Sequence, residues 1–180
     1  DNTPGGATSS INIPCGGGEV IDDLDVLVQI SHSWVGDLQV RLTKVGGASE
    51  LIVDRPGVPD STFGCSGDDI DATLDDEAAL PIEDECGGGV PTIQGEFIPG
   101  DPAGSLLASF DGDDLCGDWE LNVVDNAGGD TGTLTQWCLM AGGGGTGPGD
   151  VPATTTVGIV LMALVLLGTS VFFLRRRVTN

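Results

Sequence analysis

The chain has 180 residues, of which 28 are acidic and 6 are basic, so its formal net charge is −22. Three of the basic residues lie after the last acidic one, Asp150, so residues 1–150 carry 28 negative and only 3 positive charges, a net charge of −25. Such a surface repels nucleic acid and anionic lipid headgroups, which excludes nucleic-acid binding, and it favours divalent cations or basic partners.

Residues 1–14 are rich in Gly, Ser and Thr and predict an irregular N-terminal arm. Because the chain starts without Met, we expect that a signal peptide preceded it. A single domain is expected over residues 15–141. Alternating apolar residues over 20–30 and 38–42 predict two half-buried strands, with Val26, Val28 and Ile30 on one face of the first. A further strand over 51–53 ends at Pro56 and Gly57, which disfavour continuation.

Residues 59–100 read mostly as loop, with one short strand over 70–74, and another strand is expected over 106–110. The clearest pair of strands covers 119–124 and 133–140, joined as a hairpin by a turn rich in Asp, Asn and Gly. Strands separated by turns, with no helical periodicity between them, predict an all-β antiparallel β-sandwich.

Residues 142–153 form a glycine-rich linker, and the eighteen residues from Val157 to Leu174 contain no charge. At about 1.5 Å of rise per residue a helix here matches the hydrocarbon core of a bilayer. We therefore expect one C-terminal transmembrane helix over 154–174, because a buried soluble helix would keep a polar face. Three arginines follow and predict a cytoplasmic basic tail over 175–180, with the domain on the other side of the membrane: Arg175, Arg176 and Arg177.

This segment lacks ionisable side chains that could bind a pigment or relay protons, so we interpret it as an anchor or a packing helix in the lipid bilayer. Small residues along it permit close approach of a neighbouring helix: Gly158, Ala163, Gly168 and Ser170.

The five cysteines occur without a C-x-x-C pair and with a single His, which argues against a zinc site. In an extracytoplasmic domain they indicate two disulfides and one remaining thiol, for which fifteen arrangements exist. We favour Cys65 with Cys86, and Cys116 with Cys138 because this second pair flanks the expected hairpin. Cys15 would then pair with another subunit or stay buried as a small apolar residue.

Acidic runs offer oxygen ligands of the kind Ca²⁺ takes, six to eight at a time, although their spacing matches no EF-hand. The first candidate group is Asp68, Asp69, Asp71, Asp75, Asp76 and Glu77, and the second is Asp111, Asp113 and Asp114. The alternative is a solvated acidic surface. No other cofactor is expected.

Catalytic motifs are not found. Asp130, Thr131 and Gly132 spell the aspartic protease triplet, but that chemistry needs two carboxylates that share a proton, and the chain has one copy. The sequence contains no nucleophile elbow, phosphate loop, dinucleotide-binding loop or haem attachment motif. We therefore expect no enzymatic activity.

Several motifs occur in a fixed order: His32 to Leu38 (HSWVGDL), Asp54 to Gly57 (DRPG), Phe110 to Gly112 (FDG), Gly117 to Leu121 (GDWEL), Asp125 and Asn126, Gly129 to Leu134 (GDTGTL), and Trp137. Together they resemble the P domain, or P/Homo B domain, which follows the catalytic domain of subtilisin-like proprotein convertases and also occurs in bacterial secreted proteins. The resemblance covers residues 11–141. It implies a jelly-roll-like β-sandwich that assists a neighbouring protein and has no catalytic activity of its own.

The motif residues also have a purely structural interpretation, in which glycines permit tight turns, Asp37 and Asp130 hydrogen-bond turn N–H groups, and tryptophans fill the core. The residues concerned are His32, Trp34, Gly36, Asp37, Asp54, Pro56, Gly57, Asp118, Trp119, Asp125, Asp130, Gly132 and Trp137.

With one His and 180 residues, the chain has no room for a subtilisin-type catalytic domain beside the sandwich. We expect an accessory subunit docked on a larger integral membrane protein complex, such as a respiratory or photosynthetic one. One alternative is a cell-surface protein, because Val151, Pro152 and Ala153, the apolar run and the arginines resemble bacterial sorting signals. Another is a convertase-type P domain that assists a separate protease. The domain itself is expected to be periplasmic, on the extracytoplasmic side of the membrane.

Overall fold

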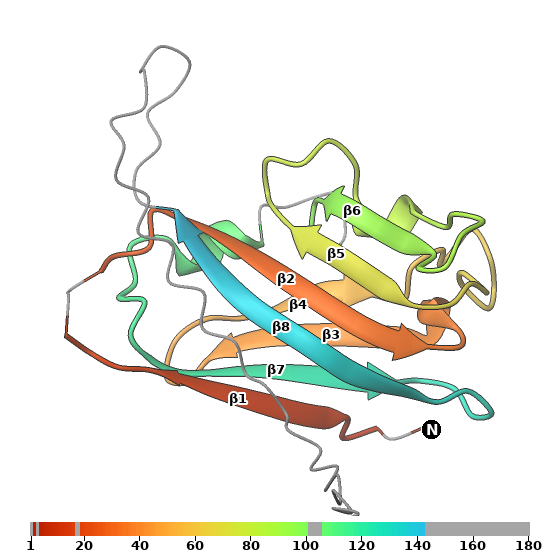
Figure 1. Ribbon diagram of the computed structural model, residues 1–180, viewed down its shortest axis with the longest axis horizontal. Helices are drawn as coiled ribbons and strands as arrows, with labels where there is room; N and C mark the ends of the chain where they lie inside the picture. The colour runs from red at the N-terminus through yellow and green to blue at the C-terminus, as the bar shows by residue number, and fades with distance from the viewer. Residues whose placement is uncertain (1, 3, 17–18, 101–105, 143–180) are drawn as a thin grey trace, which may run out of the picture.

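The computed structural model describes residues 2, 4–16, 19–100 and 106–142. Two four-stranded β-sheets face each other across one core (Figure 1). The first sheet has the order β1-β7-β3-β4, with β1 at Ala7–Ile13, β7 at Gly117–Asp125, β3 at Leu38–Lys44 and β4 at Ser49–Asp54. The second has the order β6-β5-β2-β8, with β6 at Ile93–Phe97, β5 at Ile70–Leu74, β2 at Asp23–His32 and β8 at Gly132–Gly142. The predicted β-sandwich is confirmed.

In the described ranges, three single turns of 3-10 helix lie between the strands: η1 at Val35–Asp37, η2 at Ile82–Asp84 and η3 at Leu107–Phe110. Neighbouring strands are antiparallel except β5 and β6, which run parallel in the register Ile70 to Ile93. The expectation of a wholly antiparallel sandwich is therefore wrong at this edge.

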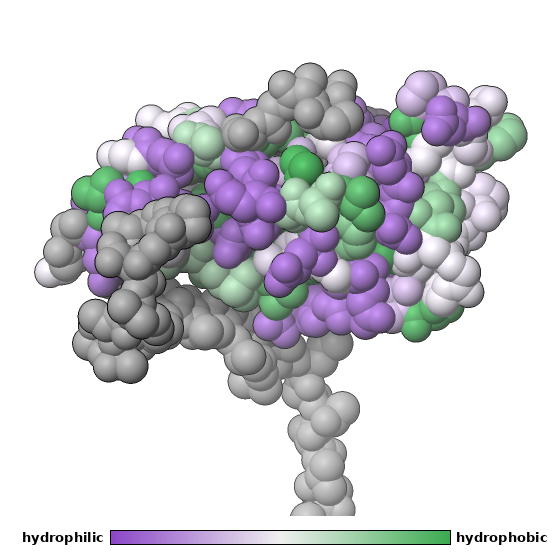
Figure 2. All heavy atoms as spheres, turned by 90° about the horizontal axis from the view of Figure 1, so that it is seen from above, coloured by the Kyte–Doolittle hydropathy of each residue, from purple (hydrophilic) through white to green (hydrophobic). Residues whose placement is uncertain are grey.

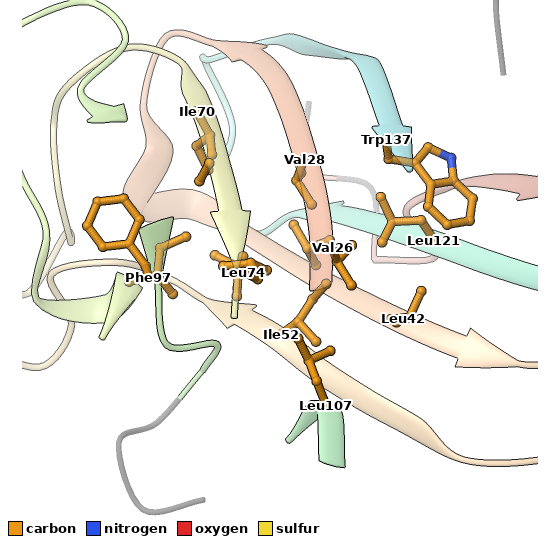
Figure 3. Packing of buried hydrophobic residues seen from close by; sticks show 14 of the residues in the cluster. Val26, Val28, Leu42, Ile52, Ile70, Leu74, Phe97, Leu107, Leu121 and Trp137 are labelled. Atoms are coloured by element: carbon orange, nitrogen blue, oxygen red, sulfur yellow. The ribbon is translucent and has the colours of Figure 1, made fainter. Parts of the chain in front are cut away.

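Alternation along β2 and β3 produces the core. Val26, Val28 and Ile30 of β2 point inward and are almost fully buried, while Asp25, Leu27 and Gln29 are only partly buried. In Figure 3 the side chains of Val26 and Val28 meet those of the facing sheet, such as Leu42 and Leu121. Burying one aliphatic side chain of this size contributes roughly 1.5 to 3 kcal/mol, so the alternating pattern is what holds the two sheets together.

The N-terminal arm is not irregular throughout, because Ala7–Ile13 forms β1 and pairs with β7, with Ile11 opposite Trp119. The strand is hard to recognise in the sequence because its inward positions are Ser or Ile that are only partly buried. Residues 106–110 also differ from the prediction. They form η3, and the Asp76 carboxylate accepts hydrogen bonds from the backbone N–H groups of Leu107 and Ala108 (3.3 and 2.8 Å), which favours a helical turn over a strand.

The predicted hairpin of 119–124 with 133–140 does not form. Both segments are strands, but β7 pairs with β1 and β3, whereas β8 pairs with β2 in the other sheet. The connection after Asp125 therefore crosses from one sheet to the other. The interval that the sequence assigned mostly to loop also contains β6.

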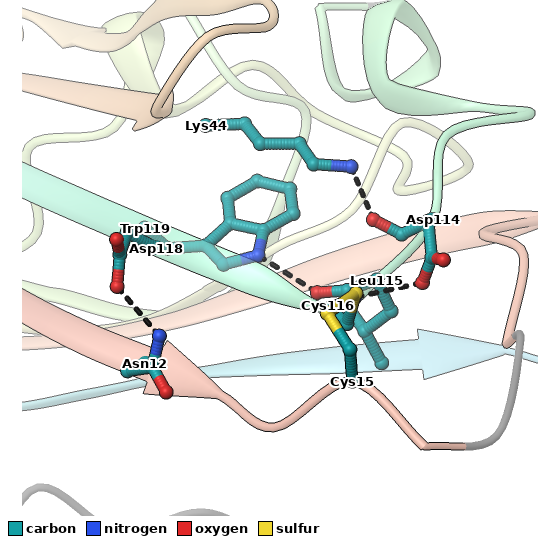
Figure 4. The surroundings of a disulfide bond; sticks show 8 residues. All are labelled: Asn12, Cys15, Lys44, Asp114, Leu115, Cys116, Asp118 and Trp119. Atoms are coloured by element: carbon teal, nitrogen blue, oxygen red, sulfur yellow. Dashed lines mark hydrogen bonds between the residues drawn. A yellow bond between two sulfur atoms is a disulfide. The ribbon is translucent and has the colours of Figure 1, made fainter.

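The disulfide prediction is half correct. Cys65 and Cys86 are bonded, with their Cα atoms 5.6 Å apart. The pairing of Cys116 with Cys138 is wrong, because β7 and β8 lie in different sheets, and Cys116 is bonded to Cys15 instead, with a Cα separation of 4.9 Å. Figure 4 shows this bond beside Leu115 and the Trp119 indole. Cys138 is a buried free thiol, and burial raises its pKa.

No helix in the described ranges is long and apolar enough to cross a membrane. The linker from residue 143 onward, the predicted span over 154–174 and the basic tail over 175–180 all lie outside those ranges.

Candidate functional site

His32 is the last residue of β2, and its side chain lies between the two sheets with 3% of the residue exposed. Its backbone N–H donates to Asp69 Oδ1 (2.8 Å), and the Asp69 N–H donates to the His32 carbonyl (2.9 Å). Nδ1 of the ring lies 2.9 Å from the Trp34 carbonyl and 3.1 Å from the Trp34 backbone nitrogen. These contacts with Asp69 and Trp34 fix the position and orientation of the imidazole.

The other ring nitrogen, Nε2, lies 3.5 Å from Oδ2 of Asp125, the last residue of β7. Asp125 Oδ1 accepts a hydrogen bond from the Ala127 N–H at 3.1 Å. Burial acts to raise the pKa of the Asp125 carboxyl, but the Ala127 N–H and the neighbouring His32 outweigh it, so that the pKa is lowered. The carboxylate is therefore held in its ionised form beside the imidazole.

A cavity of about 150 Å³ opens onto this pair, and we call it the His32 cavity. Its walls are Gly6, Ala7, Ile30, His32, Leu38, Val123, Asp125, Gly132, Thr133 and Leu134. The walls are therefore mostly apolar, and His32 and Asp125 supply the ionisable groups.

Asp37 and Asp130 support the loops around this cavity. The Asp37 carbonyl accepts hydrogen bonds from the backbone N–H and the side-chain amide of Asn126 (2.9 and 3.0 Å). Burial, and then the Asp125 charge, raise the pKa of the Asp37 carboxyl, although Arg55 opposes them. Asp130 Oδ1 accepts a hydrogen bond from the Ser33 hydroxyl (2.9 Å) instead of from a turn N–H group.

Motif glycines allow backbone segments to touch beside the Cys65–Cys86 bond. A Cβ added at Gly36 would collide with the Cys65 backbone nitrogen and lie 2.7 Å from Gly64 Cα. Gly57 has φ +84°, the left-handed region that favours glycine. A Cβ at Gly132 would collide with the backbone of β2. The glycines of the motifs are therefore required for close approach and for turn geometry, as the structural interpretation predicted.

The segment that follows β4 depends on a carboxylate that the sequence did not reveal. The Asp54 N–H donates to Glu83 Oε1 (2.6 Å), and the Gly57 N–H donates to the Glu83 carbonyl (2.7 Å). Pro56 contributes its carbonyl, which accepts from the Cys65 N–H at 2.7 Å. Glu83 stands in an ordinary acidic run, so nothing in the sequence distinguishes it from its neighbours.

Two motif tryptophans are core residues, as predicted. Trp119 is fully buried, its indole N–H donates to the Leu115 carbonyl (2.9 Å), and its ring centroid lies 5.2 Å from that of Phe110. Figure 4 shows Lys44 over this indole, with Nζ 5.6 Å from the ring centroid, which is a cation–π contact. Trp137 is 2% exposed, and its indole N–H donates to Ser9 Oγ (2.9 Å).

The remaining motif side chains make local contacts near the surface. The Trp34 indole N–H donates to the Phe63 carbonyl at 2.7 Å, and the Asn12 amide donates to Asp118 Oδ1 at 2.6 Å. These contacts join segments far apart in the sequence, so they stabilise the fold.

The first predicted calcium group is divided by β5. Asp68 and Asp69 precede the strand, Asp71 lies within it, and Asp75, Asp76 and Glu77 follow it, so Asp69 and Asp75 lie roughly 20 Å apart at about 3.3 Å per residue. Several of these carboxylates accept protein hydrogen bonds, such as that from Gln29 Nε2 to Asp71 Oδ1 (2.8 Å).

The second calcium group is likewise engaged with the protein. Asp113 Oδ2 lies 3.6 Å from Lys44 Nζ, and Asp114 Oδ1 accepts from the Cys116 N–H (3.0 Å). Within the described part of the chain, no three His, Cys, Asp or Glu side chains are arranged to hold a metal ion. Binding of Ca²⁺ stays a prediction without an assembled site behind it.

Carboxylates gather instead where β2 starts and β5 ends. Burial and then repulsion from Asp75, Asp23, Glu96 and Asp76 raise the pKa of Asp25 to about 6. Figure 2, which views the sandwich from above the orientation of Figure 1, shows hydrophilic side chains over much of that face with smaller hydrophobic patches between them.

Comparison with known families gives one match. Residues 100–141 match the family described as Proprotein convertase P-domain. The matched stretch contains η3, β7 and all of β8 except its last residue, and with them Asp125, Gly132 and Trp137. No curated protein matches the chain, and no solved structure matches it either. The match supports the P-domain resemblance over 42 of the 180 residues.

Proposed function

We propose that this chain is a non-catalytic accessory protein, whose P-domain-like sandwich lies outside the cytoplasm and binds a larger membrane protein complex. The observation that carries the proposal is the family match over residues 100–141, which covers β7 of the first sheet and nearly all of β8 of the second. The P-domain resemblance implies a module that assists another protein.

The use of the motif residues fits a non-catalytic role. A serine nucleophile needs a hydrogen bond to a general base. Here the Ser33 hydroxyl donates to Asp130, while Nε2 of His32 lies beside Asp125. The three residue types of a hydrolytic triad are thus close together, but each is engaged in holding loops.

The two disulfides support the proposed location. Such bonds persist in oxidising compartments and are rare in the cytosol. A sandwich with this chemistry, followed by an apolar run and three arginines, would be held on the outer side of the membrane.

The proposal is tested by isolating the full chain from its native membrane in mild detergent. It predicts that the chain migrates with integral membrane partners, and that replacing Gly158, Ala163 and Gly168 by Leu releases them, because close helix contact is lost. The matched control replaces Val160, Val165 and Val171 by Leu. These changes keep the segment hydrophobic and leave its small residues in place. A chain that migrates alone would contradict the proposal.

A second candidate is a P domain that assists a separate protease, and the description of the matched family favours it. Under this function the co-purified partner is a serine protease whose melting temperature falls when the chain is removed. The sorting-signal alternative predicts a mature C-terminus within residues 151–157, which mass spectrometry of the membrane-bound protein would reveal.

A further inference from the structure

Among the described residues, each sheet ends in an edge strand on the same side of the sandwich. β8 ends the second sheet and pairs with β2, and β1 ends the first sheet and pairs with β7. In Figure 1 each of them is the lowest strand of its sheet. The outer N–H and C=O groups of such strands are templates for another strand. We call this side of the sandwich the open edge.

Natural edge strands are protected by charged residues, Pro or bulges. The opposite edges follow this rule, because β4 contains Glu50 and Asp54 and β6 contains Glu96. β1 and β8 contain no charged residue and no Pro, and they belong to uncharged stretches covering residues 2–18 and 131–149. A bulge at Thr135 interrupts β8, but from Gln136 to Gly142 its pairing with β2 is regular. In a domain this acidic, the open edge is the neutral side.

A groove of about 320 Å³ runs between the two strands, and we call it the edge groove. Its lining is Ala7, Thr8 and Ser9 from β1 together with Gly132–Trp137 from β8. The hydrogen bond from the Trp137 indole to Ser9 Oγ spans the two strands. The groove is therefore lined by neutral, mostly small side chains, and it has room for the side chains of an added strand.

The edge groove continues into the His32 cavity, since Ala7, Gly132, Thr133 and Leu134 line both. In that cavity His32 Nε2 is buried and faces the Asp125 carboxylate at 3.5 Å, but it makes no hydrogen bond to any of the described residues. A buried polar atom of this kind is normally satisfied. The unsatisfied nitrogen points to a group that enters from the groove.

We propose that the open edge binds an extended, uncharged peptide segment of a partner protein, which adds a strand to β8 and places an Asn or Gln side chain in the His32 cavity. A primary amide is both donor and acceptor, so it can pair with Nε2 in either tautomer of the imidazole, while its methylene groups contact the apolar walls. Backbone pairing along β8 supplies the remaining contacts. This inference rests on the proposed function in one respect, namely that the domain binds another polypeptide.

A peptide is favoured over a sugar chain because Trp137 is buried and offers no ring face to a pyranose, whereas the strand edges offer repeating backbone groups. It is favoured over a second copy because two domains with a net charge of −25 repel each other. A neutral strand also avoids the repulsion that an acidic one would meet.

The probe is a phage-displayed library of random ten-residue peptides, selected on the purified full chain in detergent, followed by anisotropy measurements on synthetic hits. We expect hits without Asp, Glu or Pro and with Asn or Gln at one fixed position. Changing that residue to Leu should weaken binding about tenfold, the effect of one lost hydrogen bond to a buried group. When the backbone nitrogens of the peptide are methylated one at a time, binding should be lost only at every second residue, because alternate N–H groups of the added strand face β8.

Chain variants complete the test. Thr8→Lys and Thr133→Lys place a long side chain in the edge groove and should weaken binding at least tenfold. Gln94→Lys on the opposite edge adds the same charge and should leave binding within twofold. The inference is overturned if no peptide is selected, if N-methylation shows no alternation, if only neutral oligosaccharides bind, or if the chain self-associates through β8. It is also overturned if both groove variants keep their peptide affinity; continued co-purification with membrane partners would then leave the proposed function standing.

Discussion

Gly36→Ala is the substitution whose effect follows most directly from the structure. Gly36 N–H donates to the Cys65 carbonyl (2.9 Å), and the Cys65 N–H donates in turn to the Pro56 carbonyl (2.7 Å). The added Cβ would collide with the Cys65 nitrogen and lie 2.7 Å from Gly64 Cα, so only a movement of backbone can relieve the contact. The loop that must move is held by the Cys65–Cys86 bond.

The expected loss of stability is about 3 kcal/mol. Overpacking contributes about 1 to 3 kcal/mol. Weakening the two hydrogen bonds adds about 1 kcal/mol for each bond that is lost. The gain from reducing the freedom of the unfolded chain, about 0.4 to 1 kcal/mol, offsets part of this.

Urea unfolding followed by tryptophan fluorescence measures the difference. Gly88→Ala is the matched control, because a Cβ at Gly88 meets nothing within 4 Å, and this variant should equal or slightly exceed the parent. A loss below about 1 kcal/mol for Gly36→Ala would refute the close approach of the two backbones.

Three further predictions concern charge and cysteine. Because the folded pKa of Asp25 is about 6, above its ordinary value of 3.8, its contribution to stability is present below pH 4 and is lost as pH rises through 6. Asp25→Asn should therefore be more stable than the parent by about 1 kcal/mol at pH 7 and equal to it at pH 4, where the figure for pH 7 includes a discount for solvent screening. Denaturant unfolding at both pH values checks this. Replacing Cys15 and Cys116 by Ser should lower the free energy of unfolding by about 4 to 5 kcal/mol, and replacing Cys65 and Cys86 should lower it by about 3 kcal/mol. The first loss is larger because that bond closes a loop across 101 residues and the second bond closes one across 21. Equal losses in thermal or urea melts would oppose this. Alkylation before and after unfolding, followed by peptide mapping, should label only Cys138, and only in the unfolded chain. Labelling of Cys15 would instead support a bond between Cys116 and Cys138.

The sequence predicts those parts of the fold in which burial alternates residue by residue. Val26, Val28 and Ile30 in β2, and Leu38 and Val40 in β3, alternate with more exposed positions, so both strands are readable without a structure. β6 escapes the same test because only its two ends, Ile93 and Phe97, are buried.

Which strands become neighbours is harder to predict. β7 and β8 follow each other and are joined by a turn-like segment, yet each pairs with strands distant in sequence. Local pattern carries no information on which sheet a strand joins, so the hairpin was inferred wrongly, and the disulfide of Cys116 with it. Cys65 and Cys86 are only 21 residues apart, and proximity along the chain sufficed.

The sequence predicts which residues belong to the candidate site, but it does not predict how they are arranged in space. His32, Asp125 and Gly132 were singled out by motif, and the structure brings them to one cavity. The groove beside it depends on β1, whose first four residues, Ala7 to Ser10, show no apolar alternation, and on the absence of charge from two stretches more than 100 residues apart. That absence is visible in the sequence, but its meaning appears only when the two strands lie together.

The most direct test of the proposed function is native mass spectrometry of the full chain released from its own membrane. An accessory protein of 18.2 kDa bound to a larger complex predicts a dominant species of much greater mass that contains integral membrane subunits and loses this chain as a unit on activation. A dominant species at the mass of the chain alone, under conditions that keep other membrane complexes intact, would contradict the account.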